Sequence, residues 1–356
     1  MSDSIQTIPV RTSPAYTVQI APGLLGRCGA LLRDVLSPCR VAVVTDSTVA
    51  PLYLERVTAS LTSAGFSVVS YVFPAGEAHK NMETLSAILE FFAREHLTRT
   101  DCVAALGGGV AGDMAGFAAA VYLRGIRYVQ LPTTLLAAVD SSVGGKTAID
   151  LAAGKNLAGA FLQPAAVLCD TECLATLPQD VFADGAAEAI KTGVLADESL
   201  FSLFEDGTLT AAPADVIARC VAYKAGVVER DEKEQGERKL LNLGHTVGHA
   251  IEKCSGYSIP HGHAVAAGLA IMARAAQRMG WTDGPIAQRI AACLAKNDLP
   301  TGTGFSAADL ARAALSDKKR AGDTITIVVP RRMGACSLRP LPVGELEVLI
   351  AAGLEG

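Results

Sequence analysis

The chain has 356 residues, half of them hydrophobic, and a formal net charge of −5 with an isoelectric point near 5.7. This length favours two domains, and the acidic balance argues against nucleic-acid binding over a broad surface. The most apolar stretch, 264–273, is too short to cross a bilayer, and the N-terminus lacks the basic and apolar regions of a secretion signal. We therefore expect a cytoplasmic protein with no membrane partner, whose nine cysteines stay reduced.

Short β-rich runs alternate with longer helical stretches up to about residue 170. The expected strands are 40–45, 67–73, 102–106, 128–131 and 165–169. This alternation is typical of a parallel sheet that helices cover on both faces. We therefore expect a Rossmann-like α/β domain over residues 1–170.

From residue 171 the sequence becomes rich in Ala and Leu at helical spacing. The expected helices are 215–229, 243–254, 264–279 and 285–296. A late hairpin is expected from strands 324–329 and 331–337, before a last helix that begins at Val343. The second domain, 171–356, is therefore expected to be mostly helical.

The expected strand 102–106 runs directly into Gly107-Gly-Gly-Val-Ala-Gly-Asp113 and then into a helical stretch. Glycines at a helix start let backbone amides approach a phosphate, so this turn is a candidate dinucleotide site. The ordinary dinucleotide fingerprint also has an acidic residue about twenty positions later, and 127–132 contains none. Asp46, at the end of strand 40–45, either takes the ribose hydroxyls or caps the next helix.

Residues 124–164 are rich in polar groups that core packing does not explain, so we expect a loop with a binding role. Asp140-Ser-Ser-Val-Gly-Gly-Lys146 combines a carboxylate, hydroxyls, backbone amides and an ammonium, which suits a phosphorylated and hydroxylated ligand. It is not a Walker A motif, because Asp140 stands where the first glycine would be. Further cations follow at Lys224, Arg238 and the pair Lys318-Lys319, and each is either a solvated charge or part of one anion site.

Four of the six histidines lie between positions 245 and 263. On a helix, His245 and His249 share one face, and the turn Pro260-His-Gly-His263 can return two more imidazoles to them, which indicates a transition-metal site. The alternative is a solvated pair on a helix surface. The sequence has no Cys-x-x-Cys and no His-Glu-x-x-His, which argues against a thiolate zinc site and a metalloprotease.

Histidine and carboxylate are then the remaining ligand types. Glu188 in Gly185-Ala-Ala-Glu-Ala-Ile-Lys191 offers the carboxylate. The helix is otherwise small and apolar, so a charged pair on it is expected to face a ligand or another charged group. The alternative is an ordinary surface ion pair between Glu188 and Lys191.

Several long strings resemble the 3-dehydroquinate synthase family. They begin at Gly107 (Gly-Gly-Gly-Val-x-Gly-Asp), Pro132 (Pro-Thr-Thr-Leu-Leu-Ala-x-Val-Asp-Ser-Ser-Val-Gly-Gly-Lys-Thr), Gly154 (Gly-Lys-Asn-Leu-x-Gly-Ala-Phe), Ala187 (Ala-Glu-x-Ile-Lys), Leu241 (Leu-Asn-x-Gly-His-Thr-x-Gly-His-Ala) and Asp317 (Asp-Lys-Lys). The resemblance implies a homodimeric enzyme that uses NAD+ and Zn2+, with Co2+ as a substitute. Its substrate would be a phosphorylated keto acid, 3-deoxy-D-arabino-heptulosonate 7-phosphate, and its products 3-dehydroquinate and phosphate.

The resemblance also implies roles for individual residues. The metal ligands would be Glu188, His245 and His261, and His249 would handle protons beside the substrate, with Lys191 and Asn242 nearby. The substrate's phosphate and carboxylate would be held by Lys146, Lys155, Asn156, Lys224, Arg238, one of Lys318 and Lys319, and Arg124 reaching across the dimer. The dinucleotide or its edge would be lined by Asp46, Glu77, Lys80, Gly108, Asp113, Thr133, Thr134, Asp140, Lys146, Lys155 and Thr176.

The chain departs from the usual family pattern at four positions: Thr48, Ala148, Asp150 and His263 stand where Asn, Gly, Asn and Glu are common. His263 either tunes His261 or lies in solvent. Three other functions compete: a sister sugar phosphate cyclase that makes inosose or valiolone rings, a metal-dependent polyol dehydrogenase, and a non-catalytic scaffold whose metal site His249 or His263 closes. The many cations favour an anionic substrate, and the neutral Asn242 favours one that bears a carboxylate.

Overall fold

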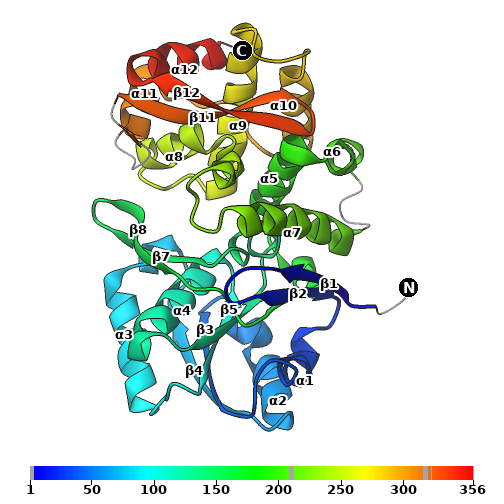
Figure 1. Cartoon of the computed structure of the whole chain (residues 1–356), viewed down its shortest axis with the longest axis vertical. Coiled ribbons are helices and arrows are strands. Elements are labelled where there is room, and N and C mark those ends of the chain that lie inside the picture. The colour runs from blue at the N-terminus through cyan, green and yellow to red at the C-terminus, as the bar shows by residue number, and fades with distance from the viewer. Residues whose placement is uncertain (1–3, 208–211, 316–319, 322, 356) are drawn as a thin grey trace. The chain divides into compact units, whose positions relative to one another are not determined.

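The computed structural model describes residues 4–207, 212–315, 320–321 and 323–355. The chain divides into two compact units (Figure 1). The N-terminal unit contains residues 1–177 and 224–232, and the C-terminal unit contains residues 178–223 and 233–356. Lys318 and Lys319, which are expected at the substrate, lie outside the described residues.

The N-terminal unit is built on a seven-stranded sheet with the strand order β1-β2-β9-β6-β5-β3-β4. Its strands are β1 (Gln6–Val10), β2 (Tyr16–Ala21), β3 (Arg40–Asp46), β4 (Ser67–Phe73), β5 (Cys102–Gly107), β6 (Arg127–Pro132) and β9 (Val167–Asp170). Neighbouring strands are parallel, apart from the antiparallel pair β1 and β2. The predicted parallel sheet is confirmed, and it has an antiparallel edge strand that the sequence did not reveal.

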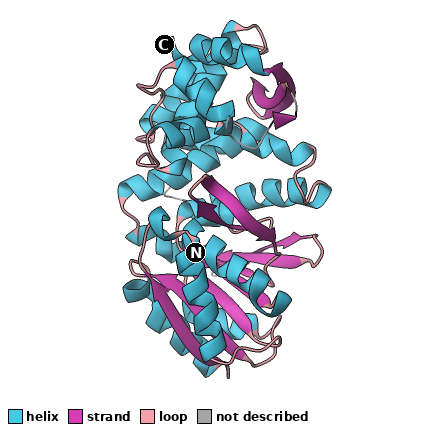
Figure 2. Ribbon diagram, turned by 90° about the vertical axis from the view of Figure 1, so that its left-hand side faces the viewer, coloured by secondary structure: helices cyan, strands magenta, loops and turns pink. Residues whose placement is uncertain are grey.

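Helices cover both faces of this sheet, as the alternation of strands and helices predicts (Figure 2). They are α1 (Cys28–Leu32), α2 (Glu55–Ser63), α3 (Met82–Arg94) and α4 (Gly109–Val121), with shorter turns η1 (Leu25–Arg27), η2 (Ala50–Leu54), η3 (Glu77–His79), η4 (Tyr122–Arg124), η5 (Ala137–Ser141) and η6 (Thr171–Thr176). On β3, Val41 and Val43 pack with α1 and α2, whereas Ala42 and Val44 pack with α3 and α4. A strand buried on both faces must be apolar throughout, because its side chains alternate between the faces.

The strand expected at 128–131 is confirmed as β6, but the expectation of a loop over the rest of residues 124–164 is wrong. The segment contains β6, the turn η5 and an antiparallel hairpin of β7 (Lys146–Leu151) and β8 (Gly154–Phe161). On β7, Thr147 and Ile149 are buried whereas Lys146 and Leu151 are exposed. Ile149 joins the apolar core that contains α4. Only one face of the hairpin is apolar, and its many glycines and polar residues hide the period of two in the sequence.

The C-terminal unit is mostly helical, as predicted. Its helices are α5 (Gln179–Ala196), α6 (Glu198–Asp206), the first part of α7 (Pro213–Arg230), η8 (Glu237–Asn242), α8 (His245–Cys254), α9 (His261–Arg278), α10 (Ala287–Lys296), α11 (Ala307–Leu315), η9 (Val343–Glu345) and α12 (Leu346–Leu354). The late hairpin consists of β11 (Thr324–Arg332) and β12 (Ala335–Pro342), with the short β10 (Arg320–Ala321) beside β11. One apolar core joins α8, α9, α11 and α12 to β11.

Helices α8 and α9 begin at histidines rather than at the predicted residues Leu243 and Ala264. Gly244, with φ of 77°, is the N-cap of α8, so the helix begins at His245. Pro260 is the N-cap of α9, so that helix begins at His261. Both imidazoles therefore stand at the first position of a helix, and this places them at the end of the helix rather than along its side.

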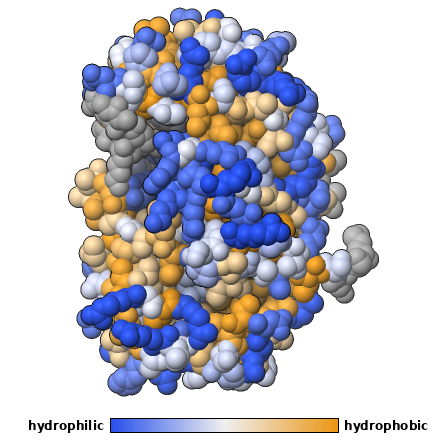
Figure 3. All heavy atoms as spheres, in the orientation of Figure 1, coloured by the Kyte–Doolittle hydropathy of each residue, from blue (hydrophilic) through white to orange (hydrophobic). Residues whose placement is uncertain are grey.

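The surface composition and the state of the cysteines are those of an ordinary folded domain without disulfides among its cysteines. Hydrophilic side chains are spread over the face shown in Figure 3, with apolar ones among them, which is the usual composition of exposed protein surface. All nine cysteines are free thiols. Among the described residues, no helix combines the length and hydropathy that a membrane span requires.

Candidate metal centre and nucleotide site

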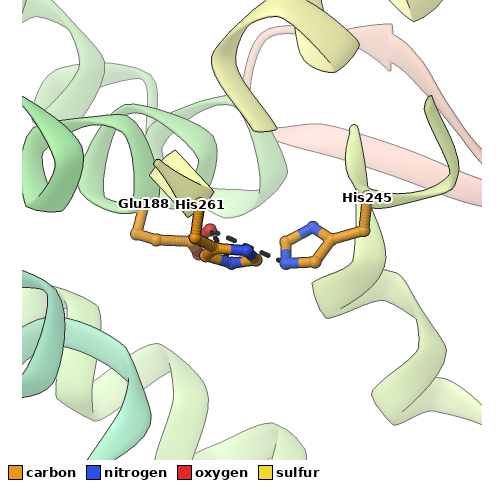
Figure 4. Close-up of side chains that lie close together, drawn as sticks. All are labelled: Glu188, His245 and His261. Carbon is orange, nitrogen blue, oxygen red and sulfur yellow. Dashed lines mark ion pairs between the residues drawn. The ribbon is translucent and has the colours of Figure 1, made fainter. Parts of the chain in front are cut away.

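Three side chains from different helices of the C-terminal unit converge on one point (Figure 4). Glu188 lies in the middle of α5, and His245 and His261 begin α8 and α9. Glu188 Oε1 is 3.6 Å from His245 Nε2 and 3.7 Å from His261 Nε2. One nitrogen or oxygen of each residue lies within 4.8 Å of the others. The structure thus brings together the three residues that the resemblance assigns to the metal.

These separations fit a shared metal ion better than direct hydrogen bonds. An N–H···O hydrogen bond is about 2.9 Å long, whereas two ligands of a tetrahedral zinc ion with bonds near 2.1 Å lie about 3.4 Å apart. Glu188 Oε2 forms an ion pair with Lys191, whereas Oε1, the oxygen that lies 3.6–3.7 Å from both imidazole nitrogens, has no hydrogen-bond partner among the described residues. Buried carboxylate oxygens are costly without such partners unless a cation is present. The donor set therefore fits a divalent ion such as zinc.

The Glu188 and Lys191 side chains are 1% and 2% exposed, so their pair is not the surface ion pair that the sequence left open. The surrounding part of α5 consists of small buried residues, Gly185, Ala186, Ala187 and Ala189. Small side chains let neighbouring helices come close, which removes the charged pair from water.

The imidazoles of His245 and His261 are each oriented through the nitrogen that points away from Glu188. His245 Nδ1 lies 3.1 Å from the Leu243 carbonyl oxygen, and His261 Nδ1 lies 3.3 Å from Glu252 Oε2. A carbonyl or carboxylate accepts from Nδ1–H and leaves Nε2 with its lone pair, as metal binding requires. Burial by itself would lower the pKa of His261, but the Glu252 and Glu188 carboxylates outweigh burial and raise that pKa. The sequence reasoning missed Glu252, whose signal is its place on α8 one turn after His249.

Glycines bring α8 and α9 close enough for their first residues to meet. A Cβ atom on Gly268 of α9 would lie 2.2 Å from the Gly244 carbonyl oxygen, and one on Gly248 would lie 3.0 Å from Val265 Cα. Gly244 and Gly248 are one helical turn apart and face α9, so His245 and His249 occupy the adjacent face. The repeated Gly-His of the sequence thus combines helix packing with a cluster of imidazoles.

A second close approach joins α5 to the start of α9. A Cβ atom on Gly262 would lie 2.0 Å from the Asp184 carbonyl oxygen. Asp184 Oδ1 accepts a hydrogen bond of 3.0 Å from the His263 N–H and lies 3.1 Å from His263 Nδ1. Because the His263 side chain is only 19% exposed and is held by Asp184, the solvated alternative for His263 is wrong. The residue that orients His261 is Glu252.

The other residues expected near the substrate in this unit lie around the same cluster or are strongly buried. The His249 ring centroid is 5.2 Å from that of His245 and 5.9 Å from that of His261. Arg238 on η8 is 1% exposed, and a guanidinium buried to this degree needs polar or anionic partners. The Asn242 amide donates a hydrogen bond of 2.6 Å to Glu234 Oε1. The expected neutral amide therefore has a carboxylate beside it, which the sequence reasoning missed.

The glycine turn of the N-terminal unit lies at the carboxyl ends of three neighbouring parallel strands. β3 ends at Asp46 and β5 at Gly107, and the N–H of Thr133, which follows β6, donates a 3.0 Å hydrogen bond to the Gly107 carbonyl. Ligands of open α/β sheets bind at this edge. In the part of the chain that the structure describes, no side chain caps the N-terminus of α4 at Gly108, so its first N–H groups can serve a phosphate.

Asp46 caps the chain after β3. Its Oδ1 accepts hydrogen bonds of 2.8 and 3.0 Å from the N–H groups of Thr48 and Val49. Its Oδ2 lies on the side of the glycine turn, where a Cβ atom on Gly107 would be 3.5 Å away. Asp46 therefore caps the turn that follows β3 and not the next helix, η2, whose N-cap is Val49, and a ribose contact would use the second oxygen. Thr134, also expected at the cofactor, packs on Gly108, where a Cβ atom would be 3.1 Å from Thr134 Cγ2.

A network of charged groups joins η3 and α4 to the β7–β8 hairpin. Lys80 Nζ lies 2.5 Å from Asp113 Oδ2 and donates a 2.5 Å hydrogen bond to Asn156 Oδ1, and Lys155 Nζ is 3.1 Å from Glu77 Oε1. Burial by itself would lower the pKa of Lys80, but the carboxylates of Asp113 and Glu77 outweigh burial and raise that pKa. The network therefore orients several residues that were expected at the cofactor or the substrate.

Four further residues that were expected at the substrate or the cofactor lie outside this network: Lys224, Asp140, Thr176 and Arg124. Lys224 Nζ donates hydrogen bonds of 2.6 and 3.0 Å to the carbonyl oxygen and Oδ1 of Asp140, so a buried lysine is paired with a half-buried carboxylate. The Thr176 hydroxyl is 2.5 Å from Tyr53 Oη. Arg124 is exposed and has a φ of 70° on the turn after α4.

Two family models match the chain. The model described as 3-dehydroquinate synthase N-terminal covers residues 70–184, and the C-terminal one covers residues 185–320. The 3-dehydroquinate synthase of Pelobacter propionicus is 45% identical over 349 residues, which are 96% of this chain and 97% of the relative. That of Neisseria gonorrhoeae is 44% identical over 339 residues, which are 93% and 94% of the two chains.

Solved structures of similar shape include the 2-epi-5-epi-valiolone synthase of Streptomyces hygroscopicus with NAD+ and Zn2+ bound. It has a TM-score of 0.87 and 27% identity, and covers 96% of this chain and 97% of its own. A 2-deoxy-scyllo-inosose synthase complexed with carbaglucose-6-phosphate, NAD+ and Co2+ has a TM-score of 0.86 and 24% identity, over 99% and 100% of the two chains. A probable glycerol dehydrogenase from Sinorhizobium meliloti has a TM-score of 0.63 and 16% identity, over 94% and 95% of the chains. The last two likenesses concern the fold alone.

Proposed function

The chain belongs to the 3-dehydroquinate synthase family, and we propose that it performs this family's reaction with NAD+ and a divalent metal, zinc or in its place cobalt. The reaction converts 3-deoxy-D-arabino-heptulosonate 7-phosphate to 3-dehydroquinate and phosphate. The observation that carries the cofactor proposal is the buried Glu188 carboxylate, which has two imidazole nitrogens at 3.6 and 3.7 Å. The solved valiolone synthase, which is 27% identical to this chain, holds NAD+ together with Zn2+.

The chemistry explains why such an enzyme needs both cofactors. The proton beside a secondary alcohol is too weakly acidic to be removed at neutral pH, whereas the proton beside a ketone is far more acidic. Temporary oxidation of the alcohol therefore permits the elimination of phosphate, and reduction afterwards restores the alcohol before the ring closes. A zinc ion would supply a Lewis acid that lowers the pKa of the substrate's hydroxyls, and NAD+ would accept a hydride that NADH returns.

In the C-terminal unit, Glu188, His245 and His261 would hold the metal. Glu252 and the Leu243 carbonyl would keep the two imidazoles in the required tautomer. His249 would take and return protons at the substrate, because its ring lies beside both metal-binding imidazoles. Lys191, Arg238 and Asn242 would contact the substrate.

In the N-terminal unit, the glycine turn and the start of α4 would receive the NAD+ pyrophosphate. Asp46 Oδ2 would take the ribose, while Thr133, Thr134, Asp140 and Thr176 would line the cofactor or its edge. Lys146, Lys155, Asn156 and Lys224 would serve the phosphate and the carboxylate of the substrate, and Glu77, Lys80 and Asp113 would hold this group in place. We also propose a homodimer in which Arg124 reaches the partner's substrate.

Two other functions share parts of this geometry. A polyol dehydrogenase would use the same glycine turn and metal ligands, but it has no need for the buried cations Lys191, Arg238 and Lys224. A sister cyclase would use the same cofactors on a sugar phosphate without a carboxylate. The relatives at 44–45% identity favour the carboxylated substrate.

One assay tests the proposal and separates it from these alternatives. Purified protein is mixed with the heptulosonate phosphate, zinc and catalytic NAD+, and released phosphate is measured while NADH absorbance is followed. We expect many phosphates per NAD+ and no sustained rise of NADH, because the hydride leaves and returns within one turnover. NADH produced in proportion to substrate would support a dehydrogenase. Faster phosphate release from sedoheptulose 7-phosphate or glucose 6-phosphate would support a sister cyclase.

A further inference from the structure

A turn of two glycines stands directly before Lys146. Gly144 and Gly145 have φ angles of 99° and 69°, a backbone conformation that favours glycine. The Gly144 N–H donates a 3.1 Å hydrogen bond to Tyr16 Oη, and the Gly145 carbonyl accepts one of 2.9 Å from the Leu162 N–H. Since Lys146 is the first residue of β7, the direction in which its side chain leaves the backbone depends on this turn.

The side chain of Gln163 covers the same turn. A Cβ atom on Gly145 would lie 2.8 Å from Gln163 Cδ and 2.9 Å from both its Nε2 and its Oε1, so the amide lies flat on Gly145. Gln163 is 7% exposed, and its Nε2 donates a 2.7 Å hydrogen bond to Glu232 Oε1. An ionised carboxylate only accepts, so this contact identifies the nitrogen end of the amide.

The hydrogen bond to Glu232 is what orients the Gln163 amide. Gln163 Oε1 is buried without a hydrogen-bond partner among the described residues. Gln163 also lines a cavity of about 570 Å³ together with Ile126 and Leu162, so close packing does not hold it on that side. A hydrogen bond to a charged acceptor is stronger and more directional than a neutral one. Removing it would let the amide rotate away from Gly145.

Glu232 links the turn to a second substrate-binding element. The segment 224–232 belongs to the N-terminal unit and begins with Lys224, which binds Asp140 through its ammonium. The two ends of this segment therefore act on the chain from Asp140 to Lys146, one by direct contact and the other through the Gln163 side chain. Lys224 holds Asp140 directly, and Glu232 holds Gly145 through the Gln163 amide.

We propose that Gln163 and Glu232 are positioning residues that fix the Gly144–Gly145 turn and thereby the place of the Lys146 ammonium. The inference rests on the proposed function, in which Lys146 is one of the residues that serve the phosphate and the carboxylate of the substrate. Neither residue needs to touch the substrate for this role. A substitution that breaks the Gln163–Glu232 hydrogen bond should therefore weaken phosphate binding and leave the metal centre of the C-terminal unit intact.

Exchange of the two side chains gives the sharpest test. Gln163→Glu sets two carboxylates against each other, Gln163→Leu removes the hydrogen bond, and Gln163→Glu combined with Glu232→Gln restores it with donor and acceptor exchanged. We expect Gln163→Glu to raise the KM for the heptulosonate phosphate and the inhibition constant of inorganic phosphate at least tenfold, with a smaller change in kcat. The exchanged pair should return both constants to within threefold of the wild type.

Glu229→Gln is the matched control. Glu229 lies on the same segment but accepts its 2.9 Å hydrogen bond from the Arg11 N–H and not from Gln163. This variant should leave both constants unchanged. The melting temperature and zinc content of each variant are measured beside the kinetics, because a purely structural defect would lower the melting temperature without acting selectively on phosphate.

The outcomes separate this proposal from the proposed function. An inactive wild-type protein would contradict the function itself. With an active wild type, unchanged constants in Gln163→Glu and Gln163→Leu would overturn the positioning role. If Gln163→Glu does not fold, the exchanged pair decides: a folded exchange variant with wild-type constants supports the proposal, and one whose KM stays raised tenfold overturns it.

Discussion

Replacing Glu252 by glutamine should weaken zinc binding although Glu252 is not a proposed ligand. Its side chain is 2% exposed, and its Oε2 lies 3.3 Å from His261 Nδ1. The carboxylate charge makes the imidazole a better donor to a metal, and the carboxylate oxygen fixes the tautomer. Glutamine keeps an oxygen that accepts from Nδ1–H but removes the charge. Leucine removes both, so the pair of variants separates the two contributions.

The expected size follows from the role of outer partners in metal sites. Loss of such a partner typically lowers metal affinity by about 10- to 100-fold, or roughly 1.4 to 2.7 kcal/mol. We place Glu252→Gln near the lower value, because the tautomer is retained, and Glu252→Leu near the upper one. Burial of Glu252 strengthens the effect, since its charge is little screened by water.

Zinc dissociation constants are measured by competition with a chromophoric chelator, and turnover is measured at limiting and saturating zinc. Turnover of Glu252→Gln should recover at saturating zinc. Glu347→Gln, an exposed carboxylate on α12, is the control and should keep the wild-type dissociation constant. An unchanged zinc affinity in both Glu252 variants would refute the assignment of Glu252 to His261 and its metal.

Three further predictions follow from single contacts. Burial raises the pKa of Asp150, so the ionised carboxylate destabilises the fold above its ordinary pKa of 3.8, and this cost vanishes below that pH. Asp150→Asn should therefore raise the melting temperature by roughly 1–3 °C at pH 7.5 and have little effect near pH 3.5. A lower melting temperature of the variant at pH 7.5 would contradict this. Gly262→Ala places a Cβ atom 2.0 Å from the Asp184 carbonyl oxygen, so it should lower the free energy of chemical unfolding by about 2–4 kcal/mol. A variant as stable as the wild type would mean that α5 and α9 can separate at no cost. Lys224→Ala should raise the KM for the heptulosonate phosphate roughly tenfold in steady-state kinetics, and loss of bound zinc in this variant would show that the reasoning about Lys224 is wrong.

Local patterns in the sequence determined the features that depend on neighbouring residues. The alternation of apolar runs and helical stretches predicted the parallel sheet, since an apolar run such as Val41 to Thr45 is buried on both faces in such a sheet. The glycines after β5 marked a helix start at the strand's carboxyl end. The one-turn spacing of His245 and His249 predicted neighbouring imidazoles.

Tertiary structure decided the features that join distant segments. The sequence could offer Glu188 as a carboxylate, but only the packing of α5 against α9 sets it 3.6–3.7 Å from two imidazoles. The tertiary structure also decided that Glu252 orients His261 and that Asp184 holds His263. It pairs Gln163 with Glu232, although the two residues are 69 positions apart in the sequence. Periodicity reports which face of an element is apolar, because that depends on local geometry. It does not report which polar side chain of another element will meet that face, because this depends on how the whole chain packs.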